Sequence, residues 1–391
     1  MKILVVCQYY YPEPFRVSDI CEELVNRGHE VFVVTGVPNY PEGKIYDGYK
    51  CGKHRDETIN GVRVHRCFTI GRRHGAFFRF LNYYSFAISS KRYVKKLKED
   101  FDLVFANQLS PVMMANAGIT YKKKHNKKLV LYCLDLWPES LTAGSVSRVS
   151  FLYKHYKKVS EKIYLQADKL LATSKMFLDY FSSEFNIDDV EYLPQYAEDE
   201  FLPEKCKKEQ NGYTDLMFAG NIGAVQSVET IIKAAEILQD VKNLRFHIVG
   251  EGSELDKIKR LSAGLKNVHF YGRQDFSDMP KFYSMADAML LTLSANPVLS
   301  YTLPGKAQTY MAAGKPIIAA IGGEAKRVIE EAKCGYCCES ENAEQFADNI
   351  MKFIDNKDKE ELGANARKYY EENFAKNKFF DKFEKAFELQ L

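Results

Sequence analysis

The chain alternates between short apolar runs and longer segments whose apolar residues recur at helical spacing. The apolar runs within Lys2–Cys7 and Glu30–Thr35 are typical of strands buried on both faces of a parallel sheet. Between them, Val17–Arg27 has helical spacing and is ended by Gly28. This order predicts a β-α-β unit and, with it, an α/β fold.

The same order begins again in the second half of the chain. Asp215–Ala219 predicts a strand, Ile231–Leu238 a helix and Leu244–Val249 the next strand. The segment 198–213 before them has no periodicity, so we place the domain boundary there. The sequence therefore predicts two parallel-sheet α/β domains, residues 1–200 and residues 213–369.

The stretch Val298–Ala320 predicts a loop, a short helix and a buried strand. Pro304 and Gly305 are typical of a helix start, and Gly314 is typical of a helix end. A helix start exposes backbone N–H groups beside a partial positive charge, to which Lys306 adds a full charge. The pattern suits a bound diphosphate, but an ordinary helix start with a solvated lysine has the same sequence.

Several predicted strands of the second half end in glycine-containing turns. Gly220 and Gly223 follow the first strand, Gly250 follows the second, and Gly272 with Arg273 follows the third. Because the carboxyl ends of parallel strands meet at one edge of a sheet, we expect these turns to converge on a phosphorylated ligand. No G-x-G-x-x-G follows the first strand of the chain, so the dinucleotide fingerprint is absent.

The first half also carries candidate chemistry after its strands. Asp135 comes just after the predicted strand Leu129–Cys133, beside Trp137, the only tryptophan. A carboxylate at a strand end could act on a substrate, although Asp before Pro-Glu-Ser is also ordinary helix-start chemistry. The loop Gly36–Lys50 is either a ligand-binding loop or a long surface loop.

The segment Arg72–Lys98 is basic and aromatic. It holds eight Lys or Arg residues and no Asp or Glu. Such a segment suits the surface of an anionic membrane, but it also suits a domain helix with buried rings and a solvated basic face. Further basic patches at 122–128 and 153–162 favour the membrane. No recognised nucleic-acid motif accompanies these patches, so no nucleic-acid partner is expected.

Composition narrows the class of protein. The 391 residues are 46% hydrophobic and 27% charged, which is typical of a soluble globular protein with more than one domain. No run of eighteen apolar residues occurs and the first apolar run stops at Gln8, so neither a membrane span nor a signal peptide is predicted. The nine cysteines are odd in number and lack zinc-site spacing, which indicates a reduced, cytosolic protein without a metal site.

Six motifs carry a resemblance to a known family: NYPEGKIYDGYK, LDLWPESL, FAGNIGAVQSVETI, IVGEGSE, DMPKFYSMADAML and TLPGKAQTYMAAGKPI. In this order they resemble the family 4 glycosyltransferases over nearly the whole chain. More narrowly, they resemble the WbuB-like subgroup of O-antigen and capsular polysaccharide biosynthesis. The resemblance implies a GT-B fold, in which two Rossmann-like domains face each other across a cleft and the last helix, about 370–391, packs back on the first domain.

The resemblance also implies an activity. A sugar would be transferred from a nucleotide diphosphate sugar with retention of configuration, without a metal or any cofactor besides this co-substrate. A UDP-linked, N-acetylated sugar is the expected donor, and a polyprenyl-diphosphate-linked saccharide is the expected acceptor. The expected location is cytoplasmic and peripheral on the inner face of the cell membrane, with Arg72–Lys98 contacting anionic lipid.

The resemblance assigns candidate site residues to both halves. Without a metal, the departing diphosphate must be neutralised by cations and helix amides, for which Lys306 is the first candidate and Arg273 the second. Asp135 is the candidate that orients the acceptor or assists proton transfer. The donor-binding candidates are Gly220, Asn221, Ile222, Gly223, Gly250, Arg273, Leu303, Pro304, Gly305, Lys306, Gln308 and Thr309. The acceptor-binding candidates are Phe15, Arg16, Asn39, Tyr40 and Trp137.

The chain departs from the family pattern at several positions. Two glutamates that many members carry fall at Tyr301 and Thr309, and a basic pair falls at Asn221 and Gln226. A histidine that is common near a strand end of the first domain is also missing. Two alternatives therefore stand beside the transferase: a nucleotide-sugar 2-epimerase, and a non-catalytic nucleotide-sugar-binding subunit of a polysaccharide assembly.

Overall fold

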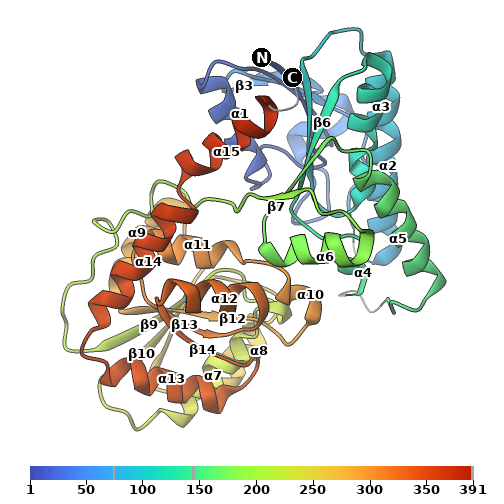
Figure 1. The fold of residues 1–391 in the computed structure, drawn as a ribbon. Helices are drawn as coiled ribbons and strands as arrows, with labels where there is room; N and C mark the ends of the chain where they lie inside the picture. The colour runs from blue at the N-terminus through green and yellow to red at the C-terminus, as the bar shows by residue number, and fades with distance from the viewer. Residues whose placement is uncertain (74, 143–145, 389–391) are drawn as a thin grey trace. The chain divides into compact units, whose positions relative to one another are not determined.

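The computed structural model describes residues 1–73, 75–142 and 146–388, which divide into two compact units. The first unit is Met1–Leu193 together with the described residues from Lys382 onward, and the second is Pro194–Asp381. Each unit has its own sheet (Figure 1). The segment 198–213, where the sequence analysis places the domain boundary, lies within the second unit.

The sheet of the first unit has eight strands in the order β3-β4-β2-β1-β5-β6-β7-β8. All neighbours are parallel except β3, which runs antiparallel to β4. The central strands β1 and β5 are almost wholly buried, so their continuous apolar runs form the core of the unit. The strands are β1 (Lys2–Val6), β2 (Glu30–Thr35), β3 (Asp56–Ile59), β4 (Val62–Arg66), β5 (Leu103–Gln108), β6 (Lys128–Cys133), β7 (Lys169–Ala172) and β8 (Val190–Tyr192).

Helices complete the first unit. The basic and aromatic segment forms α2, whose Tyr83 and Phe86 are buried while Phe77 is 69% exposed. In α15, Phe383 packs on Phe105 of β5 with ring centroids 4.8 Å apart, so this ring belongs to the core of the first unit. The helices are α1 (Val17–Asn26), α2 (Ala76–Lys96), α3 (Asn116–His125), α4 (Glu139–Thr142), α5 (Phe151–Tyr164), α6 (Lys175–Phe185) and α15 (Lys376–Glu388), with 3-10 turns η1 (Asp47–Gly52) and η2 (Val112–Ala115).

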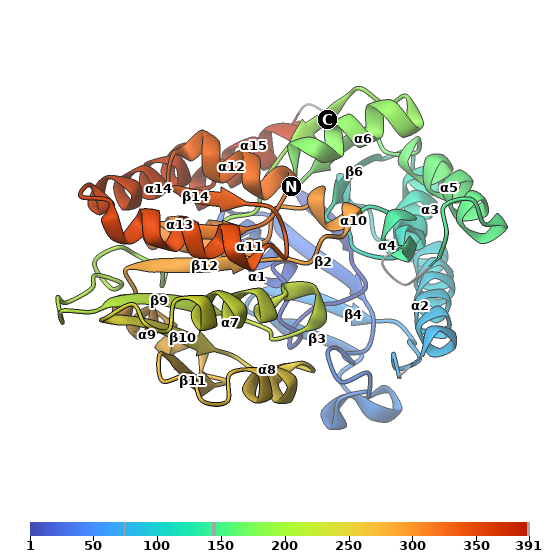
Figure 2. The ribbon, with the colours of Figure 1, turned by 90° about the horizontal axis from the view of Figure 1, so that it is seen from below.

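The sheet of the second unit has six parallel strands in the order β11-β10-β9-β12-β13-β14. Figure 2 shows β12, β9, β10 and β11 side by side. This is the doubly wound Rossmann order, so the predicted fold of two parallel-sheet α/β domains is confirmed. The strands are β9 (Thr214–Ala219), β10 (Leu244–Val249), β11 (Val268–Gly272), β12 (Ala288–Thr292), β13 (Ile317–Ala320) and β14 (Gly335–Cys338).

Helices cover both faces of the second sheet. Ile231 of α7 and Phe346 of α13 pack in one hydrophobic cluster with strand residues such as Phe246. In Figure 1 these two helices lie on the side of the sheet opposite to α9, α11 and α14. The helices are α7 (Val228–Ile237), α8 (Leu255–Leu261), α9 (Met279–Met285), α10 (Pro297–Ser300), α11 (Gly305–Ala312), α12 (Gly323–Ala332), α13 (Ala343–Asp355) and α14 (Lys359–Asn373), with 3-10 turns η3 (Ala224–Gln226) and η4 (Phe276–Asp278).

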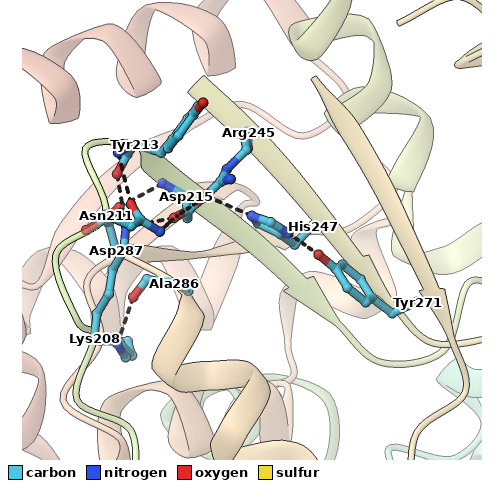
Figure 3. A network of polar contacts seen from close by, with 10 residues as sticks. Lys208, Asn211, Tyr213, Asp215, Arg245, His247, Tyr271, Ala286 and Asp287 are labelled. Atoms are coloured by element: carbon cyan, nitrogen blue, oxygen red, sulfur yellow. Dashed lines mark hydrogen bonds and ion pairs between the residues drawn. The ribbon is translucent and has the colours of Figure 1, made fainter. Parts of the chain in front are cut away.

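A buried carboxylate fixes the amino-terminal end of this sheet (Figure 3). Asp215, only 1% exposed, accepts hydrogen bonds from Arg245 Nε at 2.6 Å, His247 Nε2 at 2.9 Å and Lys208 Nζ at 2.8 Å. His247 Nδ1 in turn lies 2.8 Å from the hydroxyl of Tyr271. Burial opposes ionisation, but the hydrogen bonds from His247, Arg245 and Lys208 outweigh it and hold the pKa of Asp215 well below its usual range. The charged side chain of Asp215 thus links β9, β10 and β11 with the loop that precedes β9.

Candidate active site

Both sheets have a topological switch point, where the strand order reverses between β1 and β5 and between β9 and β12. Ligands of open α/β sheets bind outside the carboxyl ends of the strands at this point. In the second unit, the turn at Gly220 follows β9, and α10 and α11 follow β12. The donor-binding candidates in the turn after β9 and at the start of α11 therefore lie at the switch point of the second unit's sheet.

Lys306 is the central charge of this group. Its Nζ lies 2.7 Å from Gln226 Oε1 and 4.0 Å from the centroid of the Phe218 ring. Among the described residues no carboxylate pairs with it, and burial lowers its pKa to about 7. A neutral amide oxygen and a ring face stabilise an ammonium group far less than an anion does. The geometry thus leaves Lys306 able to take a bound anion.

Glycines make room for this lysine. Gly220 has φ +144°, and a Cβ there would lie 2.4 Å from Lys306 Cε. A Cβ at Gly250 would lie 1.8 Å from the carbonyl oxygen of Gly220. Neither turn could approach its neighbour so closely if the glycine carried a side chain. Together the two glycines allow the turn after β9 to lie between β10 and α11.

The helix α11 starts at Gly305, where the Pro304-Gly305 pair predicts a helix start. Pro304 occupies the N-cap position and follows Leu303. The N–H of Ala307 donates to the Pro304 carbonyl oxygen at 2.9 Å, whereas the N–H groups of Gly305 and Lys306 have no acceptor within the helix. The hydroxyl of Thr309 donates to the carbonyl oxygen of Gly305 at 3.1 Å. The structure thus brings Lys306 together with free backbone donors at a helix start.

Other donor candidates are placed differently. Gln308 is 3% exposed, and its amide nitrogen donates to the backbone carbonyl of Gln195, so its amide is occupied within the protein. The side chain of Ile222 is buried in the hydrophobic cluster, which leaves only its backbone near the turn that holds Asn221 and Gly223. Arg273 is exposed after the edge strand β11, two strands away from β9, and the structure does not bring it to Lys306.

The first unit has a pocket of about 280 Å³ at its own switch point. Tyr9 follows β1, Tyr40 follows β2, Ser110 follows β5, and Asp135 with Trp137 follows β6, and all of them line the pocket. The parallel sheet thus brings together side chains that are separated in the sequence by up to about a third of the chain length.

Asp135 is the carboxylate of this pocket. It accepts a short hydrogen bond from Ser110 Oγ, and Ser110 Oγ lies 2.8 Å from Ser140 Oγ. Burial raises the pKa of Asp135, and the hydrogen bond from Ser110 opposes this rise. A half-buried carboxylate with a raised pKa is suited to accept a hydrogen bond or a proton from a hydroxyl group.

An aromatic wall stands beside Asp135. Phe15 stacks on Tyr9 with ring centroids 4.9 Å apart and lies 5.1 Å from Tyr40. Glu13, which sequence reasoning missed, joins the two loops because its Oε1 accepts the backbone N–H groups of Asn39 and Tyr40 at 2.8 and 2.7 Å. Burial raises the pKa of Glu13 to about 7, although these backbone hydrogen bonds oppose the rise.

Two acceptor candidates do not line the pocket. Asn39 is fully buried, and its Oδ1 accepts the backbone N–H of Arg72 at 3.1 Å, so it supports the pocket from behind. Arg16 occupies the N-cap position of α1, outside the pocket lining. The structure instead adds Arg72, Arg79 and Ser110 to the lining. Arg72 and Arg79 belong to the basic segment Arg72–Lys98, which the sequence analysis linked to lipid or to a solvated helix face, and Ser110 comes just after β5.

Comparison with known families matches each half of the chain separately. The model of Glycosyltransferase Family 4 matches residues 16–195, and the model of glycosyl transferases group 1 matches residues 203–369. The chain belongs to the family 4 glycosyltransferases. The two matched ranges correspond closely to the two units and to their two candidate sites.

Relatives of this family 4 glycosyltransferase carry related names. A Pseudomonas aeruginosa protein named as a probable glycosyltransferase, WbjE, is 26% identical over 270 residues, which cover 66% of this chain and 67% of the relative. A protein of Escherichia coli K12 named for colanic acid biosynthesis, WcaI, is 23% identical and covers 80% of this chain and 82% of its own.

Solved structures share the fold. Anabaena Alr3699/HepE in complex with UDP superposes with a TM-score of 0.72 at 15% identity, over 99% of this chain and all of that chain. This likeness shows the GT-B fold of this glycosyltransferase. None of the helices that the structure describes is both long and apolar enough to span a bilayer.

Proposed function

We propose that this family 4 glycosyltransferase belongs to the WbuB-like subgroup and is a retaining, metal-independent enzyme. In this proposal it transfers a sugar, expected to be N-acetylated, from a UDP-linked donor to a polyprenyl-diphosphate-linked saccharide during cell-surface polysaccharide synthesis. The observation that carries the proposal is Lys306, a largely buried cation without a carboxylate partner beside the glycine turns after β9 and β10. The relative named for colanic acid biosynthesis and the UDP complex of HepE support the pathway and the donor.

Lys306 and the first amides of α11 act on the leaving group. As the bond between the sugar C1 and the diphosphate oxygen breaks, negative charge accumulates on UDP. A preorganised ammonium group and N–H donors stabilise that charge more in the transition state than in the ground state, which accelerates the reaction. The new bond forms between C1 and the acceptor oxygen on the same face of the sugar.

Asp135 acts on the acceptor. Its carboxylate accepts a hydrogen bond from the attacking hydroxyl group, which Ser110 and the aromatic wall help to orient. The hydroxyl proton leaves as the new glycosidic bond forms, and the raised pKa of Asp135 suits it to share that proton. Loss of Asp135 should therefore lower kcat more than it raises the KM for the donor.

A surface on α2 and α5 would contact the membrane. The hydroxyls of Tyr84 in α2 and Tyr156 in α5 lie 2.7 Å apart, so the two helices form one face (Figure 1). Phe77 is 69% exposed, and at the start of α5 Val149 and Phe151 are 77% and 86% exposed. Exposed rings among lysines and arginines suit insertion at the headgroups of anionic lipid. This surface supports a cytoplasmic, peripheral position on the inner face of the membrane.

The test is UDP release from a panel of UDP-sugars, measured with and without lipid-diphosphate-linked saccharides. We expect release that depends on an acceptor, a product with retained configuration, and loss of turnover in Lys306→Ala and Asp135→Ala proteins that remain folded. Epimerised donor without any acceptor would instead support the 2-epimerase. Tight UDP-sugar binding without turnover under any condition would support the binding subunit.

A further inference from the structure

The pocket of the first unit contains two arginines of the basic segment Arg72–Lys98, which the sequence analysis did not assign to a binding pocket. Arg72 and Arg79 both line it, and among the described residues neither is paired with a carboxylate. Both lie near Tyr83: the Arg72 guanidinium is 5.8 Å from the ring centroid, and both positive charges counteract the burial that raises the pKa of the Tyr83 hydroxyl. Two cations thus share one wall of a pocket of about 280 Å³.

A buried polar chain fixes the backbone of Arg72. Gln8 Nε2 donates to Asn82 Oδ1 at 2.7 Å, and Asn82 Nδ2 donates to Asn39 Oδ1 at 3.2 Å. The same Asn39 oxygen accepts the backbone N–H of Arg72 at 3.1 Å. Burying three amide side chains is costly unless their hydrogen bonds are formed, so this chain holds one geometry. An arginine on a fixed backbone has less freedom to lose when it binds an anion.

The other walls of the pocket have different chemistry. The rings of Tyr9, Phe15 and Tyr40 offer an apolar surface, and Asp135 offers an acceptor of hydrogen bonds. The indole N–H of Trp137 is buried and has no hydrogen-bond partner among the described residues, so it is a donor without an acceptor. This combination suits a sugar ring beside the aromatic wall, with an anionic group against the arginine wall.

The arginine wall also adjoins the apolar face of α2. Ala76 lines the pocket, whereas its neighbour Phe77 is 69% exposed on the surface that we propose contacts lipid. A ligand with a sugar, an anionic group and a lipid chain would thus meet the matching side chains in that order.

From this order we propose that Arg72 and Arg79 bind the diphosphate of the lipid-linked acceptor. The inference rests on the proposed function, because it takes the acceptor to be a lipid diphosphate saccharide. Guanidinium groups bind phosphate oxygens through paired, charge-assisted hydrogen bonds, which a lysine or a glutamine does not reproduce. The two arginines then hold the acceptor by its diphosphate, whatever saccharide the lipid carries.

Trp137 provides the measurement, because it is the only tryptophan of the chain and lines the pocket. Farnesyl diphosphate is titrated into the full chain with UDP present to fill the donor site, and the tryptophan fluorescence is recorded. The variants are Arg72→Gln and Arg79→Gln. Arg73→Gln is the matched control, because Arg73 is exposed, lies against Phe78 and is not part of the lining. Thermal unfolding midpoints verify that each variant is folded.

We expect Arg72→Gln and Arg79→Gln each to weaken farnesyl diphosphate binding by about tenfold or more, and Arg73→Gln to leave it near wild type. Farnesol should cause no saturable change in fluorescence. Equal weakening in all three variants would mean general attraction by positive charge and would overturn the inference, as would wild-type affinity in Arg72→Gln and Arg79→Gln.

Transfer assays separate this inference from the proposed function. If sugar transfer proceeds with the same acceptor KM in Arg72→Gln, Arg79→Gln and wild type, the diphosphate site is refuted while the transferase stands. If the wild type binds no UDP and transfers no sugar to any lipid diphosphate, the proposed function fails first, and the inference that rests on it falls as well.

Discussion

Donor binding should take up a proton at Lys306. In the free protein, burial lowers the pKa of this lysine to about 7, and among the described residues only Gln226 Oε1 and the Phe218 ring contact its charge. A diphosphate placed against the ammonium group favours the charged form and returns the pKa toward its ordinary value. The affinity for UDP should therefore be nearly constant below about pH 6 and fall as pH rises through the pKa of about 7.

The size of the effect follows from the protonated fraction of the lysine. With a pKa of about 7 in the free protein and a much higher one in the complex, affinity should drop roughly 15-fold between pH 7 and pH 8.5, or about 1.6 kcal/mol. Binding at pH 8 should take up about 0.9 proton per UDP. Isothermal titration calorimetry in buffers of different ionisation enthalpy measures both quantities.

Two variants of Lys306 provide the controls. Lys306→Arg keeps a charge throughout this pH range, so it should abolish the pH dependence. Lys306→Met should bind weakly at every pH without proton uptake. Tight, pH-independent binding by the wild type with no proton uptake would refute the reasoning, because it would mean that the anion does not meet this lysine.

Three further predictions concern stability and surfaces. Asp215→Asn leaves Arg245 and His247 without their anion, and Lys208 with Asp287 alone. It should lower the free energy of unfolding by roughly 3 kcal/mol in urea titrations, whereas Asp189→Asn at an 80% exposed ion pair should cost under about 1 kcal/mol. Folding lowers the pKa of Asp215, so its contribution to the free energy of unfolding is present above the unfolded pKa of about 3.9 and is lost as pH falls below that value. If acid lowered the stability of wild type and Asp215→Asn equally, this reasoning would be wrong. Gly220→Ala should displace Lys306 and weaken UDP binding measured by calorimetry, whereas Gly264→Ala, which has positive φ but no atom within 4 Å of the new Cβ, should leave UDP binding unchanged. Phe151→Asp should reduce sedimentation with anionic vesicles several-fold, and Phe276→Asp in the second unit should not.

The sequence was sufficient for the fold because buried parallel strands leave a clear signal. The strands β1, β2 and β9 each contain four consecutive apolar residues, and in β10 only Arg245 and His247 interrupt the apolar sequence. The turns after these strands contain glycine or polar residues. The strands β3 and β14 leave a weaker signal for physical reasons. In β3 the exposed and half-buried positions alternate over a mostly polar sequence, and β14 is a four-residue run that directly follows a helix.

The surroundings of the candidate residues were harder to predict. The position of Lys306 at a helix start follows from local sequence, but its contact with Gln226 joins residues from two different connections of the sheet. The same holds for Asp135 and Ser110, which meet only because β5 and β6 are neighbours. Pairing across a sheet depends on strand order, which no local pattern encodes.

The segment Arg72–Lys98 left open whether its aromatic rings are buried in the core or exposed on the surface, and the structure places some of them in each position. In α2 the rings of Tyr83 and Phe86 are core, whereas Phe77 and Tyr84 reach the surface. Aromatic residues occur all round this helix, so their spacing does not distinguish the buried face from the exposed one. Only the position of the sheet decides which rings are covered.

The division of α15 between the units has a consequence for biosynthesis. Phe383 and Phe387 are fully buried against Phe105 in the first unit, yet they are translated after the whole of the second unit. On the ribosome, the sheet of the first unit must therefore wait with part of its apolar surface uncovered while the second unit emerges and folds. The first unit, although it is synthesised first, therefore completes its core last.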